Sequence, residues 1–212
     1  IVSIGDVSTL GKLVVSGPDV VEALERIYPC RVADIKPGRS RYALLLNEAG
    51  YIFDDGLVCA LGEDGFYVTF TSAGADAAES WLREWAEVWK HNVHIANLTW
   101  SQSAIHVAGP RTRDLLAKLS DDPVDAAALP YGGVAAIRVA GVACRPERAP
   151  GQVHLVDVVE HDLGVEALGM GQEALHQLRA LHAGHVGGPV VDVGGGHQLT
   201  ALRHAGDQHG LE

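Results

Sequence analysis

The stretch YALLLNEAGYIFDDGLVCALGEDGFYVTFTSAG, residues 42–74, decides the fold expected for this chain. Its apolar runs at 42–46, 51–61 and 66–71 are separated by glycine-containing acidic turns, which predicts three β-strands. Asp54 and Asp55 interrupt the second run, although ionised carboxylates are rarely buried because their removal from water is costly. Two interpretations follow: a hairpin turn at Asp54-Asp55-Gly56, or a carboxylate pair in a cleft. On the residues alone the turn is favoured, since Asp-Gly is a strong turn signal.

Strand and helix patterns extend outward from this stretch in both directions. Residues 12–16 predict a strand, and Gly17-Pro18-Asp19 then begins a helix with apolar residues at helical spacing. Residues 75–90 predict a second helix, 93–99 and 104–108 predict strands, and a third helix runs from Gly109-Pro110 to about residue 119. This order predicts an α+β fold of the split βαβ type, with helices on one face of a largely antiparallel sheet.

The pattern of a strand, a Gly-Pro pair and an amphipathic helix occurs twice. It is VVSGPDVVEALERI at residues 14–27 and HVAGPRTRDLLAKL at residues 106–119, and the two glycines, Gly17 and Gly109, are 92 positions apart. The repeat predicts two related α+β halves.

Trp81, Trp85 and Trp89 recur every four residues in the second predicted helix. One interpretation is a stacking platform for a planar ligand. The other, which is favoured, is a helix face packed on a sheet, because most aromatic stripes at helical spacing belong to the core.

Composition narrows the class of protein. The 212 residues are 47% hydrophobic, enough for a substantial core, and the formal net charge of −11 argues against a nucleic-acid binder. The chain contains neither an apolar run of about 18 residues nor a signal peptide, and Cys30, Cys59 and Cys144 lack metal-site spacing. These features predict a cytoplasmic protein with free thiols, and the opening at Ile1 suggests a piece of something longer.

Three motifs carry a family resemblance: DVSTLGKLVVSGPDVVEALERIY at 6–28, PGRSRYALLLNEAGYIFDDG at 37–56, and AIHVAGPRTRDLLAKL at 104–119. In this order and spacing they resemble the folate-binding domain of the glycine-cleavage T-protein (aminomethyltransferase) family. Within that family the chain is most similar to the C-terminal part of the α subunit of heterotetrameric sarcosine oxidase. It shares Thr-Leu-Gly-Lys after DVS, Arg-Ser-Arg-Tyr before the strand, and Asp-Asp-Gly where aminomethyltransferases usually have Asp-Asp-Leu. The resemblance covers about residues 5–145.

The resemblance shifts the weight to the cleft interpretation and implies a catalytic carboxylate. Asp54 takes that position: it would accept a proton from a folate nitrogen and stabilise the positive charge of an iminium. Asp55 is expected to be a structural partner on the opposite face of the strand, because neighbouring side chains alternate. The resemblance implies no metal. The residues that it places around tetrahydrofolate are Leu10, Tyr42, Asp54, Thr71 and Ser72.

The function implied is the tetrahydrofolate-binding part of a sarcosine oxidase α subunit. Such a domain captures the one-carbon unit from the oxidative demethylation of sarcosine as 5,10-methylenetetrahydrofolate. Flavin and NAD would lie in other parts or subunits of the hetero-oligomeric oxidase, and neither nucleic acid nor a membrane is expected as a partner. The alternative is an inactive fragment, or a non-catalytic module of this fold that takes part in protein interaction.

Residues 146–212 differ in kind from the rest and are expected to form an atypical tail rich in Gly and His. The last 81 residues contain no aromatic side chain, and eight of the eleven histidines lie at or after His154. The family's folate-binding Glu and Arg should fall here, and only Arg179 offers a faint match. A frame error in the gene, or degeneration of the sequence, would explain both the missing aromatic side chains and the missing folate-binding residues. A metal site at His176, His182 and His185 is the weaker alternative.

Overall fold

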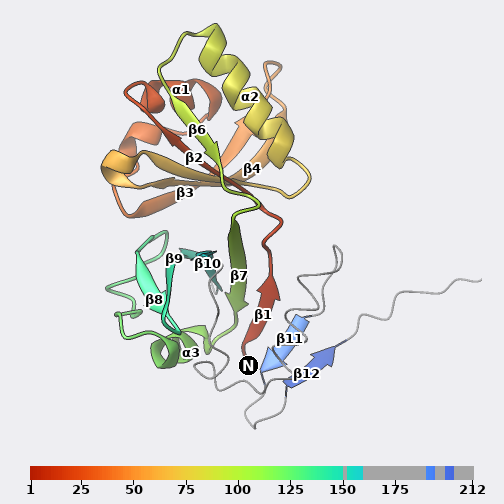
Figure 1. Ribbon diagram of the computed structural model, residues 1–212, viewed down its shortest axis with the longest axis vertical. Coiled ribbons are helices and arrows are strands. Elements are labelled where there is room, and N and C mark those ends of the chain that lie inside the picture. The colour runs from red at the N-terminus through yellow and green to blue at the C-terminus, as the bar shows by residue number, and fades with distance from the viewer. Residues whose placement is uncertain (150–151, 160–189, 194–198, 203–212) are drawn as a thin grey trace, which may run out of the picture.

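The computed structural model describes residues 1–149, 152–159, 190–193 and 199–202. In this part of the chain the strands form two sheets, drawn one above the other in Figure 1. All strand pairings in both sheets are antiparallel. The α+β fold predicted from the sequence is confirmed, and the two sheets belong to two α+β units, each of which contains one of the two Gly-Pro pairs.

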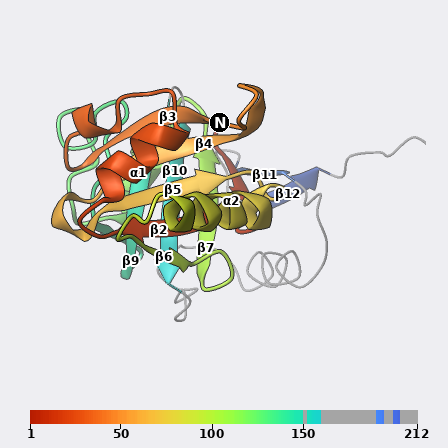
Figure 2. The same cartoon turned by 90° about the horizontal axis from the view of Figure 1, so that it is seen from above.

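The upper sheet has the strand order β3-β4-β5-β2-β6. Its strands are β2 (Gly11–Ser16), β3 (Arg39–Leu46), β4 (Ile52–Ala60), β5 (Phe66–Phe70) and β6 (His94–Asn97). Helices α1 (Val20–Ile27) and α2 (Ala75–Val88) follow β2 and β5 and cover the face that points away from the second sheet (Figures 1 and 2). The order β4-β5-β2-β6 with these two helices is the split βαβ arrangement, to which β3 adds an edge strand. Two short 3₁₀ turns, η1 (Val32–Asp34) and η2 (Gly62–Asp64), complete this unit.

The lower sheet has the order β12-β11-β1-β7-β10-β9-β8 and carries helix α3 (Thr112–Leu119). Its strands are β1 (Ser3–Asp6), β7 (Gln102–Ala108), β8 (Ile137–Val139), β9 (Val142–Ala149), β10 (Gln152–Val159), β11 (Val190–Val193) and β12 (Leu199–Leu202). The chain passes between the sheets twice, from β1 to β2 and from β6 to β7 (Figure 1).

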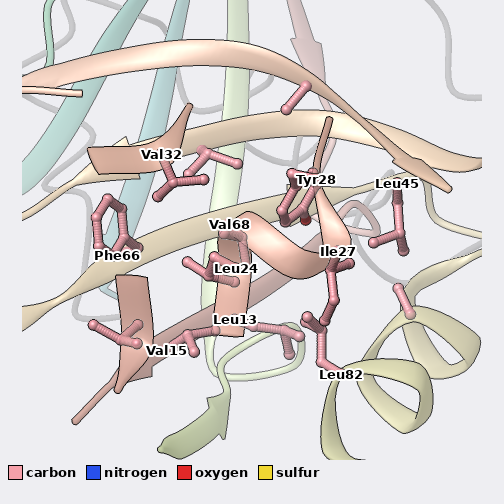
Figure 3. Close-up of a cluster of buried hydrophobic side chains, with 14 of the residues drawn as sticks. Leu13, Val15, Leu24, Ile27, Tyr28, Val32, Leu45, Phe66, Val68 and Leu82 are labelled. Carbon is pink, nitrogen blue, oxygen red and sulfur yellow. The ribbon is translucent and has the colours of Figure 1, made fainter. Parts of the chain in front are cut away.

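A hydrophobic core fills the space between the upper sheet and its two helices (Figure 3). Leu13 and Val15 of β2 face it because alternate residues of a strand share a face. Leu24 and Ile27 of α1 reach it from the helix. Trp81, Trp85 and Trp89 are half-buried and pack against the same core, as the packing interpretation predicted.

The two Gly-Pro pairs occupy equivalent places in the two units. Gly17 has a φ of +118° and Gly109 a φ of +129°, a conformation that favours glycine. A Cβ at Gly17 would lie 2.4 Å from the carbonyl oxygen of Asn92, just before β6, and one at Gly109 would lie 2.6 Å from that of Ile1, just before β1. Each glycine thus lets a strand-to-helix turn pack against the start of a neighbouring antiparallel strand, which supports the predicted repeat.

The predicted domain boundary after residue 145 falls within β9. Strand β9 pairs with β10, and β10 in turn pairs with β7. The division remains a prediction, as does the frame-error explanation of the tail. Arg179 and the histidines His176, His182 and His185 lie outside the described residues. In the described part of the chain, Cys30, Cys59 and Cys144 do not take part in disulfide bonds. No helix in the described part of the chain has both the length and the apolar character needed to cross a membrane.

Candidate functional site

The acidic pair lies inside strand β4 and not in a turn. Asp54 is opposite Leu45 of β3, and Asp55 is opposite Leu44. The reversal between these strands occurs instead around Asn47, whose side chain and main chain hold the turn that includes Gly50. The hairpin interpretation of Asp54-Asp55-Gly56 is therefore wrong.

Asp54 points toward helix α2 and is only 5% exposed. Its Oδ1 accepts hydrogen bonds from the main-chain N–H groups of Asp55 (2.6 Å) and Thr71 (3.0 Å). Its Oδ2 accepts one from the Thr71 hydroxyl (2.9 Å). Hydrogen bonds to an ionised carboxylate compensate for its loss of water, so this burial is tolerated. The carboxylate ties β4 to the turn between β5 and α2.

Tyr28, at the end of α1, is buried in the same core. Burial raises the pKa of its phenol well above the usual range, and the charges of Cys30 and Asp54 add to the shift. Tyr28 therefore stays protonated in this surrounding.

Gly74, which precedes α2, leaves room for the Asp54 carboxylate. A Cβ at Gly74 would lie 1.5 Å from Asp54 Oδ2 and 2.9 Å from Thr71 Oγ1. We expect Gly74→Ala to lower the free energy of unfolding by about 1–3 kcal/mol, because the carboxylate must move from its donors. Urea denaturation measures the loss. Gly5→Ala is the matched control, since a Cβ there meets nothing within 4 Å; equal losses in both variants would contradict the contact.

A β-bulge brings Phe53 to the same side of the sheet as Asp54. The register shifts between Leu45 and Leu46, because Asp54 pairs with Leu45 while Ile52 pairs with Leu46. Phe53 is the extra residue, and its ring lies 5.6 Å from that of Trp81 on α2. Such bulges re-aim side chains and interrupt strict alternation. The aromatic row from Phe53 along α2 therefore packs the hairpin against the helix.

Asp55 points to the opposite face and is paired with Tyr42. The Tyr42 hydroxyl donates a hydrogen bond of 2.5 Å to Asp55 Oδ2. Tyr42 is 62% exposed and Asp55 is half-buried. The Asp55 carboxylate and the Tyr42 hydroxyl are therefore both accessible to a ligand, whereas the Asp54 carboxylate is not.

The face that carries Asp55 also has an apolar floor. Cys59 and Tyr67 are buried there, and the half-buried Leu57 and Val134, the latter just before β8, pack against them. The Arg145 guanidinium lies over the Tyr67 ring at 5.8 Å from its centre. Because Val134 and Arg145 belong to the second unit, this face of the upper sheet is the one turned toward the lower sheet.

The pKa of Tyr42 is raised from its ordinary value, first by the hydrogen bond to Asp55, then by partial desolvation and the negative charges of Asp55 and Asp54. We expect Asp55→Asn to lower this pKa toward the ordinary value, since the phenolate would no longer face an adjacent carboxylate. Phenolate absorbance during an alkaline titration, taken as the difference from a Tyr42→Phe chain that isolates the Tyr42 signal, measures the change. An unchanged pKa would contradict the pairing.

Thr71 and Ser72 lie in the turn that contacts both Asp54 and the residue before Leu10. Thr71 binds the Asp54 carboxylate, and the Ser72 hydroxyl lies 2.7 Å from that of Thr9, which precedes Leu10. Of the five predicted cofactor-binding residues, Asp54 and Thr71 are therefore hydrogen-bonded, and Ser72 contacts Thr9 in the passage from β1 to β2 that also contains Leu10. Tyr42 lies on the other side of the β3–β4 hairpin with Asp55.

Lys12 of β2 was missed in the sequence. It is 1% exposed, and its ammonium donates to the carbonyl oxygens of Ser8 (2.8 Å), Leu10 (2.9 Å) and Thr99 (3.2 Å). The available signal was a single lysine within the apolar run GKLVVS.

A cavity of about 330 Å³ lies elsewhere, beside α1 and the opposite end of β4. Its lining residues are mostly glycine and apolar residues with Glu63 as the charged one, and they do not include Asp54 or Asp55. In the described residues no three His, Cys, Asp or Glu side chains are grouped so that they could hold a metal ion.

Comparison with known proteins agrees with the fold. Residues 1–149 match the family model "GCVT N-terminal domain". The chain is 39% identical over 130 residues to the sarcosine oxidase subunit alpha of Rhizobium meliloti, covering 59% of this chain and 13% of that protein. It is 32% identical over 119 residues to an aminomethyltransferase of Natranaerobius thermophilus, covering 56% of this chain and 32% of that protein. The chain thus spans between about an eighth and a third of these relatives.

Two solved structures share the fold. Aminomethyltransferase T of the glycine cleavage system from Bartonella henselae superposes with a TM-score of 0.67 at 22% identity, over 81% of this chain and 46% of that one. Heterotetrameric sarcosine oxidase from Corynebacterium sp. U-96 superposes with a TM-score of 0.57 at 14% identity, over 79% and 84%. With the family model matched over residues 1–149, the chain belongs to the GCVT N-terminal domain family.

Proposed function

We propose that this chain is a tetrahydrofolate-binding domain that captures a one-carbon unit as 5,10-methylenetetrahydrofolate. The observation that carries the proposal is the accessible Tyr42–Asp55 pair above an apolar floor, in a chain of this family. A pteridine ring has N–H donors and acceptors on an apolar plane. A carboxylate, a phenol and the floor of Leu57 and Tyr67 fit that chemistry.

Asp55 is the carboxylate that we assign to the ligand. Bound tetrahydrofolate would supply the nitrogen that attacks the one-carbon unit. Asp55 would accept the proton that this nitrogen loses and would stabilise adjacent positive charge, and Tyr42 would hold the carboxylate in place. The competing assignment is the sequence prediction, in which Asp54 has this role. The burial of Asp54 and its three hydrogen bonds favour a structural role for it.

The one-carbon donor that we propose is the product of oxidative demethylation of sarcosine. The support is the 38–39% identity to sarcosine oxidase α subunits, against about 32% for the aminomethyltransferase from Natranaerobius thermophilus. In this proposal flavin and NAD are held by other segments or subunits of a hetero-oligomeric oxidase in the cytoplasm. The domain described here would receive the one-carbon unit and would not oxidise the amine.

Thermal unfolding with and without tetrahydrofolate tests the proposal. Because a ligand that binds only the folded state stabilises it, the Tm should rise with tetrahydrofolate concentration. Free glutamate, which shares only the anionic tail of the folate, is the control and should leave the Tm unchanged. A Tm that does not respond to millimolar tetrahydrofolate would refute folate binding.

A non-catalytic module that binds another protein is the second candidate. Tyr51 and Ile52 at the tip of the β3–β4 hairpin are 73% and 63% exposed, and Trp100 is 83% exposed. Exposed aromatic and aliphatic side chains of this size are enriched at protein interfaces. Binding of a partner that is lost in Tyr51→Ser, in a chain whose Tm ignores tetrahydrofolate, would favour this candidate.

A further inference from the structure

Lys12 holds both passages of the chain between the two sheets. Its ammonium donates to the carbonyl oxygens of Ser8 and Leu10, in the passage from β1 to β2. It also donates to that of Thr99, in the passage from β6 to β7 (Figure 1). One side chain therefore fixes two segments that are 87 residues or more apart in the sequence.

The main chain of Lys12 adds two further bonds to the second passage. Its N–H donates to Thr99 Oγ1 (3.1 Å), and its carbonyl oxygen accepts from the Leu98 N–H (2.8 Å). Thr99 is itself 5% exposed. Both passages between the sheets are thus hydrogen-bonded to Lys12, one through its side chain and the other through its side chain and main chain.

The burial of the Lys12 ammonium must be compensated by other interactions. Burial of a charge is costly unless hydrogen bonds replace its water, and three carbonyl oxygens supply them here. Because all three oxygens must point at one nitrogen, the path of residues 8–10 is held in one geometry. Two further contacts hold the same turn: the Thr9 hydroxyl contacts the Ser72 hydroxyl, and the Leu10 N–H donates a hydrogen bond to the Val7 carbonyl oxygen.

We propose that Lys12 is a positioning residue for tetrahydrofolate binding, and this rests on the proposed function. The ammonium sets the main chain of Leu10, the residue expected to contact the pterin, before the ligand arrives. A turn that is already ordered loses less conformational entropy on binding, so the affinity is higher. Lys12 does not itself touch the ligand in this proposal.

The test compares Lys12→Met with Lys36→Met, which removes an exposed lysine. Methionine keeps the length and apolar stem but cannot donate to the three carbonyl oxygens. Titration with tetrahydrofolate well below each Tm should give a Kd about tenfold weaker for Lys12→Met, the factor for ordering roughly one to two further side chains. Lys36→Met should match the parent chain. A lower Tm with an unchanged Kd in Lys12→Met would mean that Lys12 is structural only and would overturn the proposal.

A ligand-free measurement separates this inference from the proposed function. Hydrogen exchange of the Leu10 amide should be slow in the parent chain and much faster in Lys12→Met. If Lys12→Met does not fold, hydrogen exchange in the parent chain still tests the proposal. A Leu10 amide that exchanges freely without ligand and becomes protected only when tetrahydrofolate binds would overturn positioning by Lys12. If the parent shows no tetrahydrofolate binding, the proposed function fails, and with it the role assigned to Lys12.

Discussion

Replacement of Asp54 by alanine is expected to lower the free energy of unfolding by about 3 kcal/mol or more. Its carboxylate accepts from the N–H groups of Asp55 and Thr71 and from the Thr71 hydroxyl, and it is 5% exposed. Alanine leaves these donors without an acceptor at a place where water has little access. Urea denaturation of the folded chain measures the loss.

Two variants sharpen this prediction. Asp54→Asn keeps an acceptor oxygen for the two N–H groups, so we expect it to cost less than alanine, about 1–2 kcal/mol. Asp121→Ala removes an exposed carboxylate and should cost within about 0.5 kcal/mol. If Asp54→Ala unfolds at the same urea concentration as Asp121→Ala, the hydrogen bonds of Asp54 do not hold the turn before α2.

Replacement of Asp55 by asparagine is expected to slow one-carbon capture by about 100-fold or more, the usual contribution of a positioned base. Asparagine keeps the shape of the side chain but does not accept a proton at neutral pH. With formaldehyde as the one-carbon source, the folded chain and tetrahydrofolate should yield 5,10-methylenetetrahydrofolate and water. The rate above the spontaneous reaction is the quantity to measure.

The same assay on Asp54→Asn decides between the two carboxylates. We expect this variant to retain most of the rate at temperatures where it is folded, because Asp54 faces α2 and the core. A loss of rate in folded Asp54→Asn together with full activity in Asp55→Asn would return the role to Asp54, as the sequence predicted.

The sequence was most informative where a local pattern meets a sheet. The apolar run at residues 12–16 predicted β2, and the Gly17-Pro18-Asp19 start followed by apolar residues at helical spacing predicted α1. Alternation also predicted that Asp54 and Asp55 face opposite sides. It could not tell which side is the core, because that depends on where α2 packs and on the bulge at Phe53, and these are set by contacts between distant segments.

Strand β1 of the lower sheet was missed for the same reason. β1 has only four residues, Ser3–Asp6, and its stability depends on pairing with β7, about 100 positions later. Lys12 was overlooked because one polar residue in an apolar strand usually faces water. Its partners, the carbonyl oxygens of Ser8, Leu10 and Thr99, meet only once the chain has passed between the sheets twice.

Amide chemical-shift mapping during a titration with tetrahydrofolate locates the face to which the ligand binds. We expect the ligand to bind the face of the upper sheet that carries Tyr42 and Asp55 and to contact Leu10, in the passage from β1 to β2. Saturable shifts should appear at these three residues and at Leu57, with the outer surface of α1 unchanged. Shifts confined to α1 and the cavity near Glu63, or none at millimolar ligand, would contradict it.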